Sequence, residues 1–227
     1  MKKQYWIALF FLFLLIDLLA IYFDNPLLQY IAKPLLMGIL LAYFIRSVDI
    51  KKGGLARWIV TALAFSWAGD ILLMADKASQ GFFIAGLVAF LIAHFFYITF
   101  FSTVQREEKI RPKPLLGVIV VVWYILLMKM IKPDELGSLT IPVRVYGAVI
   151  MIMFWMAMQM VYGKNKLAGI LMVAGAALFA VSDSVLAVDK FAGGVRYAGV
   201  IIMLTYGLAQ YLLTEGAIRK INTSKSE

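Results

Sequence analysis

Residues 57–75 read RWIVTALAFSWAGDILLMA, an apolar run long enough to cross a lipid bilayer, with an aspartate, Asp70, near its end. A membrane-spanning helix needs about 20 predominantly apolar residues. Seven further runs satisfy this criterion, so eight transmembrane helices are expected. They lie at roughly residues 5–23, 28–45, 57–75, 81–101, 115–131, 141–162, 167–188 and 195–215. The predicted fold is therefore all-α, a polytopic membrane bundle forming a single transmembrane domain over residues 1–227.

The composition agrees with a lipid environment and narrows the chemistry. Hydrophobic residues make up 63% of the 227 residues, and the mean hydropathy is +0.88, whereas soluble domains are usually about half apolar. The chain has no cysteine and one histidine, which excludes disulfides, thiolate metal sites and histidine-rich metal sites. No metal or cofactor is expected. The net charge of +9 fits basic cytoplasmic loops better than nucleic-acid binding, which we do not expect.

The distribution of basic residues predicts the orientation. Of the 22 Lys and Arg residues, 15 lie on the side that carries the N-terminus, 6 lie on the other side, and Lys33 lies within a helix. Since cytoplasmic loops carry the excess of Lys and Arg, both termini are expected in the cytoplasm. The first apolar run contains Asp17 and lacks a small-x-small cleavage site, so we interpret it as a retained helix rather than a signal peptide. A bacterial inner membrane is the expected location.

An internal repeat relates the two halves of the chain. The segment containing Gly69-Asp70 aligns with the segment containing Ser182-Asp183 at an offset of 113 residues, and Gly86 matches Gly199 at the same offset. The two helices that carry these aspartates run in the same direction. This pattern favours two parallel four-helix repeats. Two helix ends that are alike by chance in a chain rich in Leu and Ala are the alternative.

Four ionisable side chains fall at one depth in the predicted helices. Asp17, Lys33, Asp70 and Asp183 each lie five or six residues from the non-cytoplasmic end of their helix, roughly 8–9 Å below that boundary. An ionisable group inside the membrane is costly and indicates a functional site by default. Of two carboxyls in one low-dielectric site, one keeps its proton while the other is charged. Asp70 and Asp183 are therefore the candidates for acid–base catalysis.

Neighbouring residues are candidates for supporting roles. Lys33 is expected to hold the charged carboxylate or to meet a phosphate, although Pro34 beside it also predicts a simple bend in the helix. Ser66 lies one turn before Asp70 on the same helix face. Ser182 directly precedes the second aspartate and allows a close approach there.

Packing roles are favoured for two other polar residues. Asp17 has no counterpart in the repeat, so a structural role is more consistent with its position. His94 is expected some 12 Å deeper in the membrane than the aspartates if the helices are regular. With Tyr97 one turn further along, His94 is interpreted as half of a hydrogen-bonded packing pair.

These residues resemble the lysoplasmalogenase family of YhhN-like integral membrane proteins over roughly residues 30–211. The resemblance rests on short motifs in order along the chain: Lys33-Pro34, Phe65-Ser66, Gly69-Asp70, Leu73, His94, Tyr97, Tyr146-Gly147, Phe179, Ser182-Asp183 and Leu186. It implies hydrolysis of the vinyl ether bond of a lysoplasmalogen to a fatty aldehyde and a glycerophospho-ethanolamine or -choline. It also implies a lysophospholipid substrate taken from the membrane lipid, with the two aspartates as the catalytic pair. The substrate phosphate would meet Lys33 or Arg144.

Other function classes remain open on the residues alone. Intramembrane aspartyl proteases also use two helix-borne aspartates, but typically carry Gly-x-Gly-Asp, where this chain has Trp67-Ala68-Gly69-Asp70. A small ion-coupled transporter would explain a parallel repeat and buried acids, although its acids should line a path across the bilayer rather than share one layer. A non-catalytic scaffold is disfavoured by the cost of burying so many charges.

Overall fold

The computed structural model describes residues 2–50, 54–75, 79–131 and 136–223. These residues form eight long helices and no strand, which confirms the predicted all-α class. The helices are α1 (Lys3–Tyr22), α2 (Pro26–Ser47), α3 (Gly54–Met74), α4 (Gln80–Glu107), α5 (Gly117–Met130), α7 (Thr140–Gln159), α8 (Lys166–Phe191) and α9 (Ala198–Thr223). Short 3-10 turns (Pro114–Leu116, Gly137–Leu139 and Met160–Tyr162) flank α5 and α7.

Seven of these helices are long and apolar enough to cross a membrane, which makes the chain a multi-pass membrane protein. The exception is α5, which has 14 residues and is therefore about 21 Å long. With the preceding 3-10 turn it extends over Pro114–Met130, close to the predicted span 115–131. Large apolar side chains are exposed around the bundle, among them Leu27, Leu115 and Ile141, each more than 70% exposed. Such a surface requires lipid contact.

Polar N-caps begin two helices where the sequence breaks its apolar runs. Asn25 accepts a hydrogen bond from the backbone N–H of Leu28 (3.1 Å), and Pro26 occupies the first turn of α2. Asn165 accepts one from Ala168 N–H (2.9 Å) at the start of α8. These side chains satisfy backbone donors that a helix N-terminus otherwise leaves unpaired.

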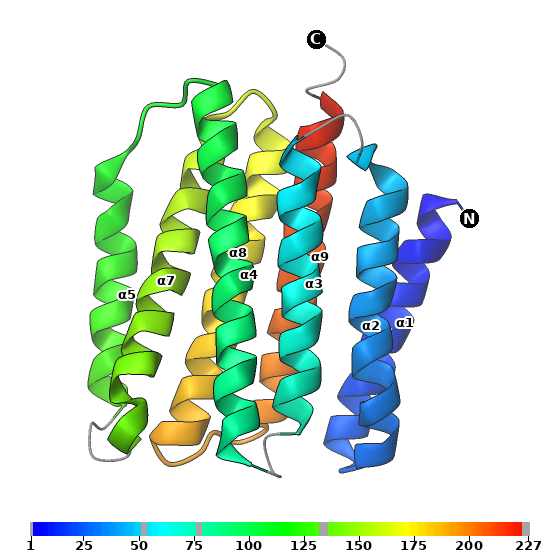
Figure 1. Cartoon of the computed structure of the whole chain (residues 1–227), viewed down its shortest axis with the longest axis vertical. Coiled ribbons are helices and arrows are strands. Elements are labelled where there is room, and N and C mark those ends of the chain that lie inside the picture. The colour runs from blue at the N-terminus through cyan, green and yellow to red at the C-terminus, as the bar shows by residue number, and fades with distance from the viewer. Residues whose placement is uncertain (1, 51–53, 76–78, 132–135, 224–227) are drawn as a thin grey trace.

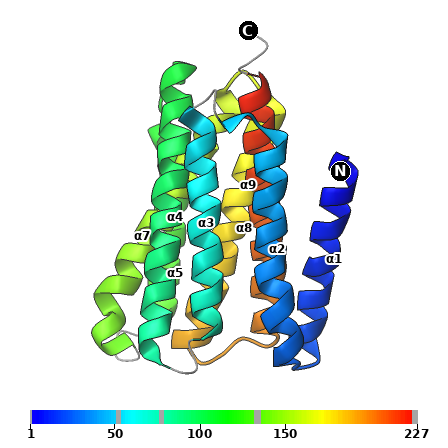
Figure 2. The ribbon, with the colours of Figure 1, turned by 45° about the vertical axis from the view of Figure 1, so that its right-hand side comes forward.

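The helices stand side by side, and both termini lie at one end of the bundle (Figure 1). The pairs α3–α4 and α8–α9 pack most extensively. α1 lies at the outer edge beside α2 (Figure 2). Close packing depends on small residues: a Cβ atom on Gly175 of α8 would lie 2.8 Å from the backbone nitrogen of Leu213 in α9. In the same way a Cβ on Gly86 of α4 would lie 2.7 Å from the side chain of Leu73 in α3.

Ion pairs tie α9 to its neighbours at the end that carries the termini. Lys3 Nζ lies 2.6 Å from Glu215 Oε1, and Arg219 also pairs with this carboxylate. Lys220 Nζ lies 2.6 Å from Glu108 Oε1 at the end of α4. The opposite half of the bundle contains the two aspartates singled out by the sequence.

Candidate active site

Asp70 on α3 is buried, with 2% of its side chain exposed, and is held by two donors. The Tyr206 hydroxyl of α9 donates a hydrogen bond to its Oδ2 at 2.6 Å. Lys33 Nζ on α2 lies 3.3 Å from its Oδ1, and the Lys33 side chain is 12% exposed. A buried charge is tolerated when it is paired and hydrogen-bonded. The geometry therefore fits an ionised Asp70 carboxylate.

Asp183 on α8 has a different environment. The Tyr146 hydroxyl of α7 donates a hydrogen bond to Asp183 Oδ2 at 2.6 Å. Among the residues that the structure describes, no Lys or Arg lies within ion-pair distance of this carboxyl. Without a cation, an ionised carboxylate in a membrane interior is expensive. The two aspartates thus differ in their partners, one a lysine and a tyrosine, the other a tyrosine alone.

The two contacts occupy equivalent places in the predicted repeat. Lys33 and Asp70 are 37 positions apart, and so are Tyr146 and Asp183. The first pair precedes the second by the same 113 residues that relate the aspartates. Each contact also joins corresponding helices, α2 to α3 and α7 to α8. This equivalence is what a parallel repeat would produce, with a lysine in one half replaced by a tyrosine in the other.

Both aspartates line one cavity of about 160 Å³. Its polar lining comes from Lys33, Tyr146, Ser182 and Tyr206 together with the two carboxyls. Its apolar lining comes from α3, α4, α8 and α9: Leu73, Phe83, Leu87, Phe90, Leu186, Ile202 and Met203. Ser182 donates a hydrogen bond to the carbonyl oxygen of Ile202 at 3.1 Å, which fixes α8 against α9 beside Asp183.

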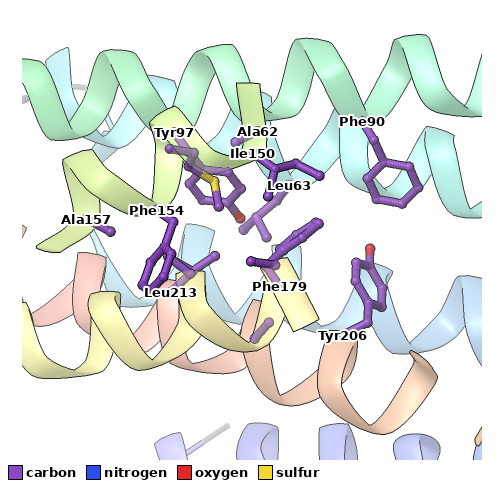
Figure 3. Close-up of a cluster of buried hydrophobic side chains, with 14 of the residues drawn as sticks. Ala62, Leu63, Phe90, Tyr97, Ile150, Phe154, Ala157, Phe179, Tyr206 and Leu213 are labelled. Carbon is purple, nitrogen blue, oxygen red and sulfur yellow. The ribbon is translucent and has the colours of Figure 1, made fainter. Parts of the chain in front are cut away.

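Aromatic rings close the inner side of this cavity. Phe90 of α4, Phe179 of α8 and Tyr206 of α9 converge in Figure 3, with ring centroids 5.5–6.2 Å apart. Their edge-to-face arrangement is a favourable one for aromatic pairs. Gly69 makes room for it, because a Cβ atom there would lie 2.7 Å from the Phe90 ring. The cluster packs apolar rings beside the site and fixes the Tyr206 ring, whose hydroxyl donates to Asp70.

His94 lies nearer to the aspartates than its spacing from the helix end indicates. Its ring centroid is 5.6 Å from the ring of Tyr146, which donates to Asp183, and 4.7 Å from that of Phe179. His94 Nδ1 donates to the carbonyl oxygen of Phe90 at 2.5 Å. The depth estimate assumed that all helices end at one height, but the lower end of α4 reaches below that of α3 in Figure 1. His94 thus packs edge-to-face against the Tyr146 ring and does not line the cavity. Tyr97 bonds not to His94 but to Gln210 Oε1, at 2.8 Å.

Three other candidates lie outside the cavity. Ser66 is fully buried one turn before Asp70, and its hydroxyl has no hydrogen-bond partner among the described residues. The Arg144 side chain is exposed, and its backbone carbonyl accepts a hydrogen bond from Tyr124 at 3.2 Å. Asp17 is fully buried, and neither of its carboxyl oxygens has a hydrogen-bond partner in the described part of the chain.

Tyr206 is the residue of the site that sequence reasoning missed. It donates the shortest hydrogen bond to Asp70 although the two residues are 136 positions apart. Its counterpart in the repeat is Ala93, so the repeat gives no signal for it. Only the packing of α9 against α3 brings the hydroxyl to the carboxylate.

The arrangement can donate a proton from one side of a cavity and accept one from the other. Over the described ranges, no group of three or more His, Cys, Asp or Glu side chains is close enough to hold a metal ion. The functional groups are therefore two carboxyls, one ammonium group, two phenols and one serine hydroxyl. Such a set suits general acid–base chemistry on a mainly apolar substrate.

Comparison with known proteins gives a consistent result. The profile of the YhhN family matches residues 28–217. The chain is 34% identical to the lysoplasmalogenase TMEM86A of Bos taurus over 163 residues, which is 70% of this chain and 65% of that protein. It is 33% identical to the lysoplasmalogenase TMEM86B of Homo sapiens over 169 residues (74% and 66%). It is also 33% identical to a lysoplasmalogenase of Mycobacterium tuberculosis over 170 residues (70% and 60%).

The chain thus spans about two thirds, or slightly less, of the length of the curated relatives it matches. No solved structure matches it significantly. The family match covers α3, α4, α5, α7 and α8 entirely, with most of α2 and α9. It includes both aspartates and their partners Lys33, Tyr146 and Tyr206. The chain belongs to the YhhN family of membrane proteins.

Proposed function

We propose that this protein is a membrane-embedded hydrolase that cleaves the vinyl ether bond of lysoplasmalogens by two-aspartate acid–base catalysis. The observation that carries the proposal is one cavity lined by the buried carboxyl of Asp70 and the partly buried carboxyl of Asp183. Among the described residues, Asp70 is paired with a cation and Asp183 is not. The lysoplasmalogenases among its relatives support the substrate class. The products would be a fatty aldehyde and a glycerophospho-ethanolamine or -choline.

In the first half of the reaction Asp183 acts as the acid. Its carboxyl has no cation partner among the described residues and shares the cavity with the Asp70 carboxylate, so it holds a proton at rest even though its Oδ2 accepts the Tyr146 hydrogen bond. That proton passes to the β-carbon of the vinyl ether, the C=C electron pair forms the new C–H bond, and an oxocarbenium ion remains. The carboxylate of Asp70, held by Lys33 and Tyr206, stabilises this cation electrostatically. Asp70 then takes one proton from the water that adds to the cationic carbon, which gives a hemiacetal.

In the second half the two aspartates exchange roles. Asp183, now a carboxylate, takes the proton from the hemiacetal hydroxyl. Asp70, now protonated, donates to the ether oxygen as the C–O bond breaks and the glycerol leaves. The cycle ends with Asp183 protonated and Asp70 ionised, as it began. It consumes one water and needs no external acid, base or cofactor.

The phosphate contact is a separate part of the proposal. Lys33 is already engaged by Asp70, and we assign it to the charge of that carboxylate. Arg144 is exposed near the start of α7, where it is available to the headgroup of a lipid whose reacting bond lies deeper. Kinetics with ethanolamine and choline headgroups test this assignment. Arg144→Ala is expected to change the headgroup preference, and unchanged kinetics would remove Arg144 from the account.

Orientation follows from the charge distribution. We propose a bacterial inner membrane with both termini in the cytoplasm, which places the aspartates in the half of the membrane away from the cytoplasm. The two termini lie at the same end of the bundle (Figure 1), as this topology requires. Reporter enzymes fused to the C-terminus test it, since a reporter active only in the periplasm should give no signal.

The decisive test is aldehyde release from a vinyl-ether lysophospholipid by the purified protein in detergent. Asp70→Asn and Asp183→Asn are each expected to lower the rate by about 10²–10⁴-fold, the contribution of a positioned acid or base. Asp17→Asn is the matched control, because it makes the same change at a buried aspartate that does not line the cavity. Asp17 interacts electrostatically with Lys33 and Asp70, so a loss smaller than that of either cavity variant is expected. Equal losses of rate in all three variants would show that Asp70 and Asp183 are not the catalytic acid and base.

The alternative functions predict different results in the same preparation. An ion-coupled carrier moves its substrate only across a sealed membrane, so it leaves the lipid in detergent unchanged. A protease cleaves peptides and leaves the vinyl ether intact. Folded wild-type protein that releases no aldehyde from either headgroup class would therefore reject the hydrolase proposal.

A further inference from the structure

The cavity between the aspartates holds only part of a lysolipid. Its volume is about 160 Å³, whereas pockets that enclose a drug-sized ligand have roughly 300–1,000 Å³. A lysoplasmalogen carries one long alkenyl chain in addition to its headgroup. The cavity accommodates the reacting bond, and the chain requires a second site.

An apolar groove lies on the lipid-facing side of α5 and α8, with a volume of about 550 Å³. Ile119, Val122 and Leu126 line it from α5, and Val185 and Val188 line it from α8. The α5 side chains are each about half exposed. From Ile119 to Leu126 the α5 wall extends for about 10 Å along the helix axis, parallel to the direction in which lipid chains lie.

A narrow cavity of about 30 Å³ between α5, α7 and α8 adjoins both the groove and the candidate active site. That cavity shares Leu127 and Ser184 with the groove. It shares Tyr146 and Asp183 with the larger cavity between the aspartates. The three spaces therefore lie in a row, and the proposed acid, Asp183, stands between the groove and the second carboxylate.

Helix α5 is the most loosely held wall of this row. In its 14 residues only Val120 and Leu127 are buried. It stands at the left edge of the bundle in Figure 1 and packs mainly against α7. One hydrogen bond connects it to α8, from Trp123 Nε1 to Ser184 Oγ at 3.1 Å. A small outward shift of α5 would widen the passage at Leu127 without disturbing the helices that carry the aspartates.

We infer that the groove between α5 and α8 binds the single alkyl chain of the lysolipid and delivers its first carbons to Asp183 past Leu127 and Ser184. This inference rests on the proposed function for its substrate. It assigns chain-length selectivity to α5, with Val122 in the middle of the groove as a selectivity-determining residue.

A matched pair of substitutions tests the selectivity. Val122→Trp fills the groove, whereas Val118→Trp makes the same change one turn earlier on α5, at a half-exposed residue that lines none of these spaces. A blocked chain misplaces the reacting bond, so Val122→Trp should lower the long-chain to short-chain ratio of kcat/KM by about 10- to 100-fold. Val118→Trp should leave the ratio unchanged. A ratio unchanged in Val122→Trp, or lowered equally in both variants, overturns the assignment.

Cross-linking tests the groove independently of turnover. The probe is a saturated-ether lysophospholipid, which cannot be cleaved by this chemistry, with a diazirine near the end of its chain. Wild-type protein in detergent should be labelled on α5 between Ile119 and Leu126, and excess vinyl-ether lysolipid should remove the label. Labelling elsewhere, or labelling that lysolipid does not compete, means that the groove holds bulk lipid only. Competed labelling without aldehyde release would retain the groove and reject the hydrolase, and the reverse result would retain the hydrolase and reject the groove.

Discussion

Replacing Lys33 by methionine removes the cation that keeps Asp70 charged while preserving the length of the side chain. Asp70 is 2% exposed and Lys33 is 12% exposed, with 3.3 Å between Nζ and Oδ1. Breaking a buried pair by removing one partner costs about 3–5 kcal/mol, because the remaining charge stays buried without compensation. Since Lys33 retains some contact with the surface, we expect the lower end of that range, about 3 kcal/mol.

The measurement is the free energy of unfolding in mixed micelles, by titration with a denaturing detergent, for four proteins: the wild type, Lys33→Met, Asp70→Asn and the double variant. Asp70→Asn should cost less than Lys33→Met, because a lysine can turn its amine towards the surface. The double variant should be more stable than Lys33→Met alone, giving a coupling energy of more than about 1 kcal/mol. It should remain inactive, because the proposed base is absent.

Lys3→Met is the matched control. Lys3 lies closer to its carboxylate partner, at 2.6 Å, but its side chain is 50% exposed. Glu215 is 5% exposed, but it keeps Arg219 and the Tyr43 hydroxyl as partners when Lys3 is replaced. With a half-exposed cation, this pair should contribute about 1 kcal/mol or less. If Lys33→Met cost no more than Lys3→Met, or if the two substitutions at the site were additive, Lys33 would not be the counterion of a charged Asp70.

Further substitutions test other parts of the site. Tyr146→Phe removes the hydrogen bond to Asp183 and should lower kcat by about 10- to 100-fold with little change in KM; an unchanged kcat would mean that Tyr146 does not position the acid. Gly69→Ala should destabilise the protein by about 1–3 kcal/mol, because the added Cβ would lie 2.7 Å from the Phe90 ring. Gly38→Ala is the control and should be tolerated, because the nearest atom to its added Cβ would be 3.7 Å away. Equal unfolding free energies for the two variants would contradict this packing. Asp17→Leu should raise the unfolding free energy by about 1–3 kcal/mol, because it replaces a buried carboxyl that has no hydrogen-bond partner among the described residues. A loss of stability would mean that the attraction between Asp17 and Lys33 outweighs the cost of burial.

The helices were predictable because membrane-spanning segments are recognisable from their length and apolar content. All eight predicted ranges contain a helix in the structure, and the largest differences are at the ends of α4 and α9, which extend beyond the apolar run. The α9 extension carries Arg219 and Lys220, and Glu108 directly follows the α4 extension. Lys220 pairs with Glu108, and Arg219 pairs with Glu215, at the end with the termini. Hydropathy cannot place such helix ends, because polar pairing replaces lipid contact there.

The convergence of the two aspartates was also predictable, because each is a costly group at a similar depth in an otherwise apolar helix. The contacts Lys33–Asp70 and Tyr146–Asp183 fall at equivalent positions of the repeat, although the repeat gave no reason to pair them. Tyr206 could not be predicted, since tyrosines are common near helix ends and nothing local distinguishes this one. The exposed position of Arg144 likewise depends on how α7 rotates, which hydropathy does not determine.

The central claim is that a carboxyl group protonates the β-carbon of a vinyl ether, and the source of the new C–H bond tests it most directly. The wild-type protein should hydrolyse a vinyl-ether lysophospholipid in D₂O, with the aldehyde reduced at once to an alcohol and analysed by mass spectrometry. The account predicts one deuterium on the carbon next to the former aldehyde carbon, and a rate lower by about 10²–10⁴-fold in Asp183→Asn. Product without that deuterium, or labelled product from Asp183→Asn at the wild-type rate, would contradict it.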